Sequence, residues 1–171
     1  MNIYTIHRQG ETIPKLVMEG IVNQSIDCSL IPISQEEGNT PRLNSVNNWI
    51  RALEYATDEP FIGMDGDVVM DDEDTIKTLL KGVENVFMAT IRTQILHIKC
   101  NKDKVKMAHA LFACIEPKIL RDELIKIREN WNDGCSMCRV IKELVMQKRK
   151  VNLIAFPTAY ECRRKRLERS K

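Results

Sequence analysis

Short apolar runs alternate along the chain with longer segments in which apolar residues recur at helical spacing. The β-branched and aromatic residues at 2–7 predict a first strand. The spacing over about 12–23 predicts a helix, and the apolar run at 26–33 predicts a second strand. Pro41 suits the first turn of a second helix, which leads into a third strand at 60–64. The first part of the chain therefore follows the order β-α-β-α-β.

The second part of the chain continues this alternation but adds a group of consecutive strands. Strands that alternate with helices imply an α/β fold, with a mixed, mainly parallel sheet covered by helices on both faces. The consecutive strands predict a mixed or antiparallel edge on that sheet. In such folds ligands bind beyond the carboxyl ends of the strands. The predicted elements are a helix capped by Asp72, strands at 85–93, 94–100 and 109–116, helices at 117–131 and 137–145, and a final strand at 151–156.

The most distinctive stretch is 60–70, where an apolar run ends in two aspartates separated by one glycine. Side chains alternate along a strand, so Asp65 and Asp67 are predicted to point the same way, with Gly66 allowing a sharp turn between them. Two carboxylates in apolar surroundings are costly unless a positive group lies between them. A hard divalent cation shared with a phosphate is the usual candidate. The alternative is a surface turn with solvated acids, and the acids at 71–74 most simply complement a helix N-terminus.

The composition is that of a soluble globular domain. The chain has 171 residues, of which 43% are hydrophobic and 29% charged, enough for one domain with a buried core. No apolar stretch approaches the ~18 residues that cross a bilayer. The N-terminal residues lack the basic region and long apolar core of a secretory signal. These observations favour a cytoplasmic protein with a single domain at 1–162.

Basic charge is concentrated in a tail at 163–171 (RRKRLERSK), whereas the whole chain carries a net charge of only +2. Such a tail suits peripheral contact with nucleic acid or with an anionic membrane surface. A solvated terminus is the simpler interpretation. The pI near 8.2 is below that of a dedicated nucleic-acid-binding domain, so nucleic acid is not the expected partner.

Six cysteines offer a second possible chemistry. Cys135 and Cys138 have the spacing of a metal or redox pair, but a structural zinc site needs two more ligands and the sequence has no second close pair. Reduced thiols are expected, with a disulfide as the alternative. The other four lie in or beside apolar runs, where a free cysteine behaves as a small buried hydrophobe: Cys28, Cys100, Cys114 and Cys162.

Three stretches carry a resemblance to a known family. In ALEYATDEPFIGMDGD, at 52–67, a helix leads through an alanine and a short turn into an apolar strand that ends in D-x-D, and DDEDTIKTLLKGVEN, at 71–85, supplies a helix directly afterwards. In NDGCSMCRVIKELVMQKRKVNLIAFP, at 132–157, an acid precedes a helix, a basic turn and a strand that ends in proline. This layout resembles the nucleotide-sugar glycosyltransferases of the GT-A fold, especially the family 2 type. The resemblance covers roughly 1–162 and implies a single GT-A-like, Rossmann-like domain.

The resemblance implies metal-dependent transfer of a sugar from a nucleotide-diphosphate-sugar donor to a hydroxyl acceptor. Asp65 would approach the ribose or the metal, and Asp67 would ligate the Mn²⁺ or Mg²⁺ that bridges the two phosphates. Asp133 matches the catalytic base of inverting members, with a helix cap or an Asp-Gly turn as the alternative. His7 and Arg8 match the nucleotide-contacting loop. A divalent ion stabilises the charge left on the departing phosphate, and a carboxylate removes the proton of the attacking hydroxyl.

Two positions depart from the pattern of that family. An acid that binds the nucleobase often follows the second strand, whereas this chain reads PISQ at 32–35, which makes Ser34 the candidate nucleotide contact there. Many members supply a histidine to the metal or diphosphate near the C-terminus, whereas Arg163 stands in that region here.

Two other functions fit parts of the sequence. Haloacid-dehalogenase-like phosphatases also place D-x-D after an apolar strand and would use Asp65 as the nucleophile, but they normally carry this motif on their first strand. A non-enzymatic GT-A-like protein would instead use the basic tail at 163–171 to bind nucleic acid or a protein partner.

Overall fold

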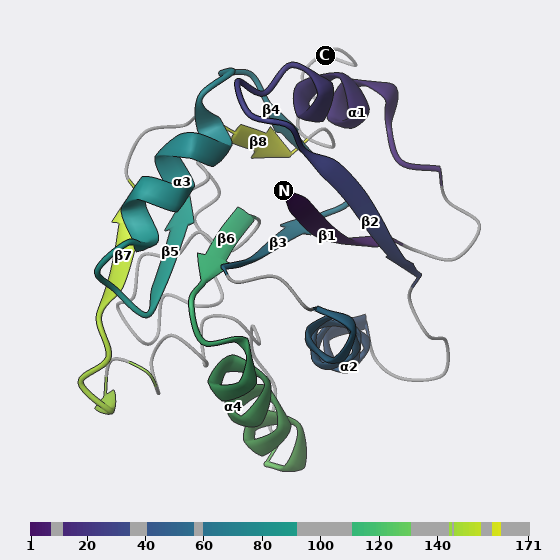
Figure 1. Ribbon diagram of the computed structural model, residues 1–171. Coiled ribbons are helices and arrows are strands. Elements are labelled where there is room, and N and C mark those ends of the chain that lie inside the picture. Colours follow the sequence, from purple (N-terminus) through teal and green to yellow (C-terminus); the bar gives the residue numbers. More distant parts are fainter. Residues whose placement is uncertain are drawn as a thin grey trace, which may run out of the picture.

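The computed structural model describes residues 1–7, 12–34, 41–56, 60–91, 111–130, 144, 146–154 and 159–161. These residues form a six-stranded sheet in the order β2-β1-β3-β6-β5-β7 and a separate two-stranded sheet of β4 and β8 (Figure 1). The strands of the large sheet are β1 (Asn2–His7), β2 (Ser29–Ser34), β3 (Phe61–Asp65), β5 (Met88–Ile91), β6 (Leu111–Cys114) and β7 (Val151–Ile154). The small sheet pairs β4 (Val68–Met70) with β8 (Ala159–Glu161).

Helices cover both faces of the large sheet, as the alternating sequence predicts. The helices in the described ranges are α1 (Lys15–Val22), α2 (Pro41–Tyr55), α3 (Thr75–Val83) and α4 (Pro117–Glu129). Buried residues of α2 and α4 belong to one hydrophobic cluster, and those of α1 and α3 belong to another, on the opposite side of the sheet (Figure 1). Neighbouring residues of β1 alternate between the two clusters, with Ile3 in one and Tyr4 in the other. The predicted α/β class, with a mixed sheet between helical layers, is confirmed.

An aromatic cluster anchors β3 on the α2 side of the sheet. The Trp49 ring lies edge-on to Phe112, with 5.1 Å between ring centroids, and edge-on to Phe61 at 6.4 Å. Gly63 makes this packing possible, because a Cβ at this position would overlap the rings of Phe112 and Trp49. β3 is therefore held firmly just before it ends at Asp65.

Several element predictions are confirmed, and one about the sheet is wrong. β1 and the start of α2 lie where the sequence places them. The antiparallel strand is not at an edge: β6 lies inside the sheet, between β3 and β5, and runs opposite to both. All four β6 residues are buried, and the strand pairs with β3 on one side and β5 on the other. The predicted strand at 94–100 and, except for residue 144, the predicted helix at 137–145 lie outside the described residues.

Two cysteines fall within the described ranges, and both are reduced thiols, as expected. Cys114 is buried in β6, and partial burial raises the pKa of the Cys28 thiol. The other four cysteines lie outside the described residues. None of the helices in the described part of the chain combines the length and the apolar character needed to span a bilayer.

A buried carboxylate on α4 is held by a polar network. The Glu123 side chain is 6% exposed and accepts hydrogen bonds from Lys126 Nζ at 2.7 Å and Gln147 Nε2 at 3.1 Å. Burial alone would raise the pKa of Glu123, but these hydrogen bonds and the charges of Lys126 and Arg149 together hold its pKa below the usual glutamate range. The ionised form is therefore the one that the fold stabilises.

This network predicts an acid-dependent loss of stability. Because the pKa of Glu123 is lower in the folded state, its carboxylate stabilises the fold at neutral pH, and this contribution disappears as the pH falls through the folded pKa. Glu123→Gln should be less stable by about 1 kcal/mol at pH 7. The variant should also lose less stability than the wild type between about pH 5 and pH 3. Urea unfolding at several pH values measures both effects, with the exposed Glu129→Gln as a control that should follow the wild type. Parallel pH curves for the wild type and Glu123→Gln would contradict this assignment.

Candidate functional site

Three parallel strands bring their carboxyl ends together at one edge of the large sheet. β1 pairs in parallel with β2 and with β3, so that His7 lies opposite Ser34, and Ile6 lies opposite Asp65. The chain leaves β1 towards β2 on one side and later returns on the other side to form β3. Such a reversal of strand order opens a crevice at the carboxyl edge, which is where ligands bind in open α/β sheets. Three predicted site residues, Ser34, His7 and Asp65, therefore meet at this edge.

The turn between the two aspartates is fixed to the end of β1. The backbone N–H of Gly66 donates a hydrogen bond to the carbonyl oxygen of Ile6 at 3.0 Å. A Cβ at Gly66 would lie 2.8 Å from that oxygen and 3.3 Å from His7 Cβ. A glycine is therefore needed at position 66 for the turn to approach the backbone of β1 this closely. The sequence suggested a different reason for this glycine, the sharp turn that its backbone allows. The turn therefore lies directly against β1 and beside His7.

The two carboxylates lie on either side of the predicted turn. The sequence suggested that Asp65 and Asp67 point the same way, with Gly66 allowing a sharp turn between them; β3 ends at Asp65, and Gly66 and Asp67 form that turn into β4. Side-chain alternation from Phe61 places Asp65 on the face covered by α2. Both aspartates are partly buried. The two acids therefore flank Gly66 at the turn that ends β3.

The strand that follows the turn is supported from α1. All three residues of β4 are buried. Gly20 of α1 lies so close to β4 that an added Cβ would be 2.7 Å from the carbonyl oxygen of Met70. β8 pairs with the other side of β4, and Glu161 lies opposite Val68, the residue after Asp67. These contacts support the strand into which the turn leads.

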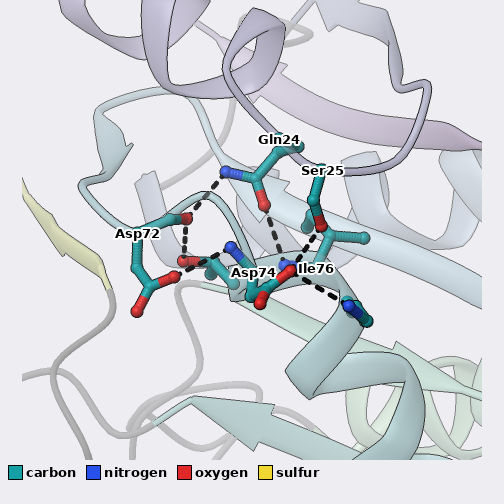
Figure 2. Close-up of polar contacts among 7 residues, drawn as sticks. Gln24, Ser25, Asp72, Asp74 and Ile76 are labelled. Atoms are coloured by element: carbon teal, nitrogen blue, oxygen red, sulfur yellow. Dashed lines mark hydrogen bonds and ion pairs between the residues drawn. The ribbon is translucent and has the colours of Figure 1, made fainter.

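A side-chain amide ties α1 to the start of α3 (Figure 2). Gln24 donates from Nε2 to the carbonyl oxygens of Gly20 at 2.9 Å and Asp72 at 3.0 Å, and its Oε1 accepts from the N–H of Ile76 at 2.9 Å. Gln24 is only 9% exposed, so these contacts satisfy a buried polar group. The amide thereby fixes the segment that follows β4.

The acids at 71–74 lie at the start of α3, as the sequence suggested, but Asp72 is not its cap: Asp74 occupies the N-cap position, and no side chain makes a capping hydrogen bond there. The Asp72 carboxylate accepts a hydrogen bond from the N–H of Asp74 at 2.8 Å, just before the helix begins at Thr75. The hydrogen bond from Ser25 Oγ to the Asp74 carboxylate lowers the pKa of Asp74 (Figure 2). These contacts account for Asp72 and Asp74 as local structure at the helix N-terminus.

The donor set of the turn suits a hard divalent cation. Within the described residues, no three His, Cys, Asp or Glu side chains are grouped to hold a metal ion by themselves. Asp65 and Asp67 offer two carboxylates at a ligand-binding edge. Mg²⁺ is commonly held by one or two carboxylates, with substrate phosphates and water completing its shell. The residues present therefore fit a metal that is bound together with a phosphate ligand.

Two predicted site residues cannot be placed, and one residue that reaches the carboxyl edge was not predicted. Arg8 and Asp133 lie outside the described residues. Arg51 on α2 donates a hydrogen bond from its guanidinium to the carbonyl oxygen of Ser34, at the carboxyl end of β2. A basic residue on a predicted helix ordinarily lies on a solvated face, so nothing in the sequence pattern distinguished Arg51.

Comparison with known proteins shows likeness in structure but not in sequence. No family model matches the chain, and no curated protein sequence matches it. The glycosyltransferase GlyE of Streptococcus pneumoniae superposes with a TM-score of 0.59 at 10% identity, over 88% of this chain and 44% of GlyE, so the chain spans less than half of that protein. A 4-diphosphocytidyl-2C-methyl-D-erythritol synthase from Anaerococcus prevotii has a TM-score of 0.59 at 13% identity, over 90% of this chain and 87% of its own.

A third neighbour is a glycosyltransferase involved in the glycosylation of the major capsid of PBCV-1. Its TM-score is 0.59 at 13% identity, over 91% of this chain and 82% of its own. Identities this low establish the fold alone. The chain thus has a GT-A-like α/β fold, the architecture of its glycosyltransferase and nucleotide-diphospho-sugar transferase neighbours.

Proposed function

We propose that this protein is a glycosyltransferase that moves a sugar from a nucleotide-diphosphate-sugar donor to a hydroxyl acceptor with Mn²⁺ or Mg²⁺. The observation that carries the proposal is the Asp65-Gly66-Asp67 turn, hydrogen-bonded to the end of β1 at the point where the strand order reverses. Two partly buried carboxylates at that edge fit a cation shared with a diphosphate. The GT-A-like fold and its glycosyltransferase neighbours add support.

Each residue has a defined part in the proposed reaction. Asp67 and Asp65 would hold the divalent ion, which stabilises the negative charge that develops on the leaving diphosphate. His7 and Ser34, beside Asp65 at the carboxyl edge, would contact the nucleotide, together with Arg8.

Asp133 would accept the proton of the acceptor hydroxyl as its oxygen attacks the anomeric carbon. The new C–O bond forms while the bond from the anomeric carbon to the diphosphate oxygen breaks. The nucleoside diphosphate then leaves with the electron pair.

The fold argues against one of the alternatives. A haloacid-dehalogenase-like phosphatase normally carries its nucleophilic aspartate on the first strand, whereas Asp65 ends β3 of a GT-A-like sheet. The basic tail at 163–171 remains compatible with peripheral contact to a membrane surface or a protein partner, in addition to the proposed activity.

A product analysis tests this proposal. The protein is incubated with a panel of nucleotide-diphosphate sugars, with Mn²⁺ or with EDTA, and the nucleotides released are separated by chromatography. Slow hydrolysis to nucleoside diphosphate that requires Mn²⁺ is the expected result, since water can replace an acceptor hydroxyl. Release of nucleoside monophosphate would instead indicate nucleotidyl chemistry and contradict sugar transfer.

A further inference from the structure

Two turns meet at the edge of the large sheet opposite the candidate site. β5 and β7 begin at this edge and β6 ends there, because β6 is antiparallel to both β3 and β5 (Figure 1). The N–H of Phe87, the residue before β5, donates to the carbonyl oxygen of Lys150 at 2.9 Å. The N–H of Ile115 donates to the carbonyl oxygen of Phe87 at 3.2 Å. The turn before β7 and the turn after β6 are therefore joined through Phe87.

An ion pair and a cation–π contact also join these two turns. Arg149 Nη1 lies 2.8 Å from Glu116 Oε2, and the Arg149 guanidinium lies over the ring of Phe87, 4.9 Å from its centroid. This pair neutralises Glu116, the carboxylate of the turn after β6. The remaining charge of the two turns therefore comes from lysines.

Five exposed side chains belong to these turns and to the first turn of α4. We call them the amino-edge surface: Ile115, Lys118, Met146, Lys148 and Lys150. Met146 is 69% exposed and Ile115 is 37% exposed. Among the described residues, none pairs with any of the three lysines. The surface thus combines unpaired positive charge with exposed apolar side chains.

Lys148 has a backbone conformation that favours glycine. Its φ is 60°, and no other non-glycine residue in the described part of the chain has a positive φ. Residues 144 and 146 are helical, and the N–H of Arg149 donates to the carbonyl oxygen of Leu144 at 2.9 Å. This hydrogen bond closes a helix in the Schellman motif, in which the left-handed position is usually glycine. Since glycine adopts this φ without steric cost, the backbone gives no reason for a lysine here.

An anionic lipid surface matches both the charge and the apolar side chains. A lysine near such a surface is attracted to the headgroups and contributes about fivefold to the affinity. An apolar side chain between the lysines can enter the boundary between headgroups and acyl chains. The phosphates of a nucleic-acid duplex would also match the lysines, but a duplex offers no apolar layer for Met146 and Ile115.

We propose that the amino-edge surface docks this protein on an anionic lipid bilayer. Lys118, Lys148 and Lys150 contact the headgroups, and Met146 enters the boundary with the acyl chains. Asp65 lies at the opposite ends of the strands, so the candidate site faces away from the bilayer. Docking is therefore independent of the proposed sugar transfer.

Co-sedimentation with vesicles tests this proposal. The intact chain is mixed with vesicles of phosphatidylserine and phosphatidylcholine in equal parts, and separately with vesicles of phosphatidylcholine alone. Binding to the first vesicles should weaken as the salt concentration rises, and binding to the second should be weak at every salt concentration. Lys118→Gln/Lys150→Gln should weaken binding to the anionic vesicles about twentyfold. Met146→Gln should weaken it about threefold or more.

Lys148→Gly separates docking from folding. Glycine suits the positive φ at this position, so the variant should unfold at the same urea concentration as the wild type or at a higher one. Its affinity for the anionic vesicles should nevertheless fall about fivefold, because one headgroup contact is lost. Urea unfolding and co-sedimentation measure the two effects on the same protein.

Lys15→Gln/Lys77→Gln is the matched control. It removes the same charge from exposed positions of α1 and α3, the helices on the other face of the sheet, and should keep the wild-type affinity within about twofold. A comparable loss in this control and in Lys118→Gln/Lys150→Gln would show that net charge alone drives binding, and would overturn the proposal. Wild-type affinity in Lys148→Gly and in Lys118→Gln/Lys150→Gln would overturn it too, since binding would then lie elsewhere, for example in the basic tail.

The wild type alone can also overturn the proposal. Failure to bind the anionic vesicles, with or without binding to a DNA duplex, would exclude docking on a bilayer. Equal binding to both kinds of vesicle would exclude the role of the lysines. None of these results changes the expected metal-dependent binding of nucleotides at the opposite edge of the sheet.

Discussion

Replacing Asp67 by asparagine should remove the metal-dependent part of nucleoside-diphosphate binding and leave the protein folded. Asparagine has nearly the same shape as aspartate but lacks the negative charge that a hard cation requires. The substitution lies in the turn between β3 and β4, outside the buried strands themselves. In the presence of Mn²⁺ the affinity should fall at least about tenfold, towards the value measured with EDTA. Isothermal titration with and without Mn²⁺ measures the change.

Asp71→Asn provides the matched control for this prediction. Asp71 is an exposed acid that follows β4 directly, so the same chemical change is made four residues further along the chain. Its affinity for nucleotides should stay within about twofold of the wild type, since a solvated surface charge contributes little to binding. Equal loss of affinity in both variants would point to general electrostatics and would contradict a specific metal contact by Asp67.

Gly66→Ala should weaken the same binding although it retains both aspartates. The added Cβ would lie 2.8 Å from the carbonyl oxygen of Ile6, a backbone atom that cannot move independently of β1. The turn must shift away from β1 and weaken the hydrogen bond from Gly66 to Ile6. We expect a stability loss of about 1–3 kcal/mol and a fall of about tenfold or more in Mn²⁺-dependent affinity. Urea unfolding and calorimetry measure the two effects.

Gly82→Ala separates a local effect on the site from a general effect of substituting glycine. Gly82 lies on α3 and faces Ile154 of β7, at the edge of the sheet opposite β2. Alanine there is favoured by helix propensity, but its Cβ would meet Ile154 Cδ1 at 2.9 Å. The stability of Gly82→Ala depends on whether helix propensity or the contact with Ile154 has the larger effect. In either case its nucleotide affinity should equal that of the wild type. Wild-type affinity in Gly66→Ala would show that contact between the turn and β1 is not needed for binding.

Sequence patterns correctly predicted the elements whose formation depends on the residues within them. The β-branched and aromatic run at 2–7 forms β1 with the predicted bounds, and Pro41 begins α2, because proline is favoured in the first turn of a helix. The acidic turn after β3 was likewise visible from an apolar run that ends in aspartates. The edge at which three parallel strands end together also followed from the alternation of strands and helices.

The parts that the sequence did not predict depend on contacts between distant segments. The inside position of β6 follows from its pairing with both β3 and β5, which no local pattern specifies. β8 has only three residues and exists because it pairs with β4, about ninety positions earlier. The hydrogen bond from Arg51 to Ser34 joins a helix to the end of a strand, and it has no sequence pattern of its own. Register and strand direction are set by tertiary packing.

Metal-dependent binding of a nucleoside diphosphate is the central claim, and one calorimetric comparison tests it most directly. Wild-type protein and an Asp65→Ala/Asp67→Ala variant are titrated with GDP, CDP, UDP and ADP, each with Mn²⁺ and with EDTA. The wild type should bind at least one of the four only when Mn²⁺ is present, and the double variant should bind none of them in a metal-dependent manner. Absence of Mn²⁺-dependent binding by the wild type, or equal binding by the folded double variant, would contradict the claim.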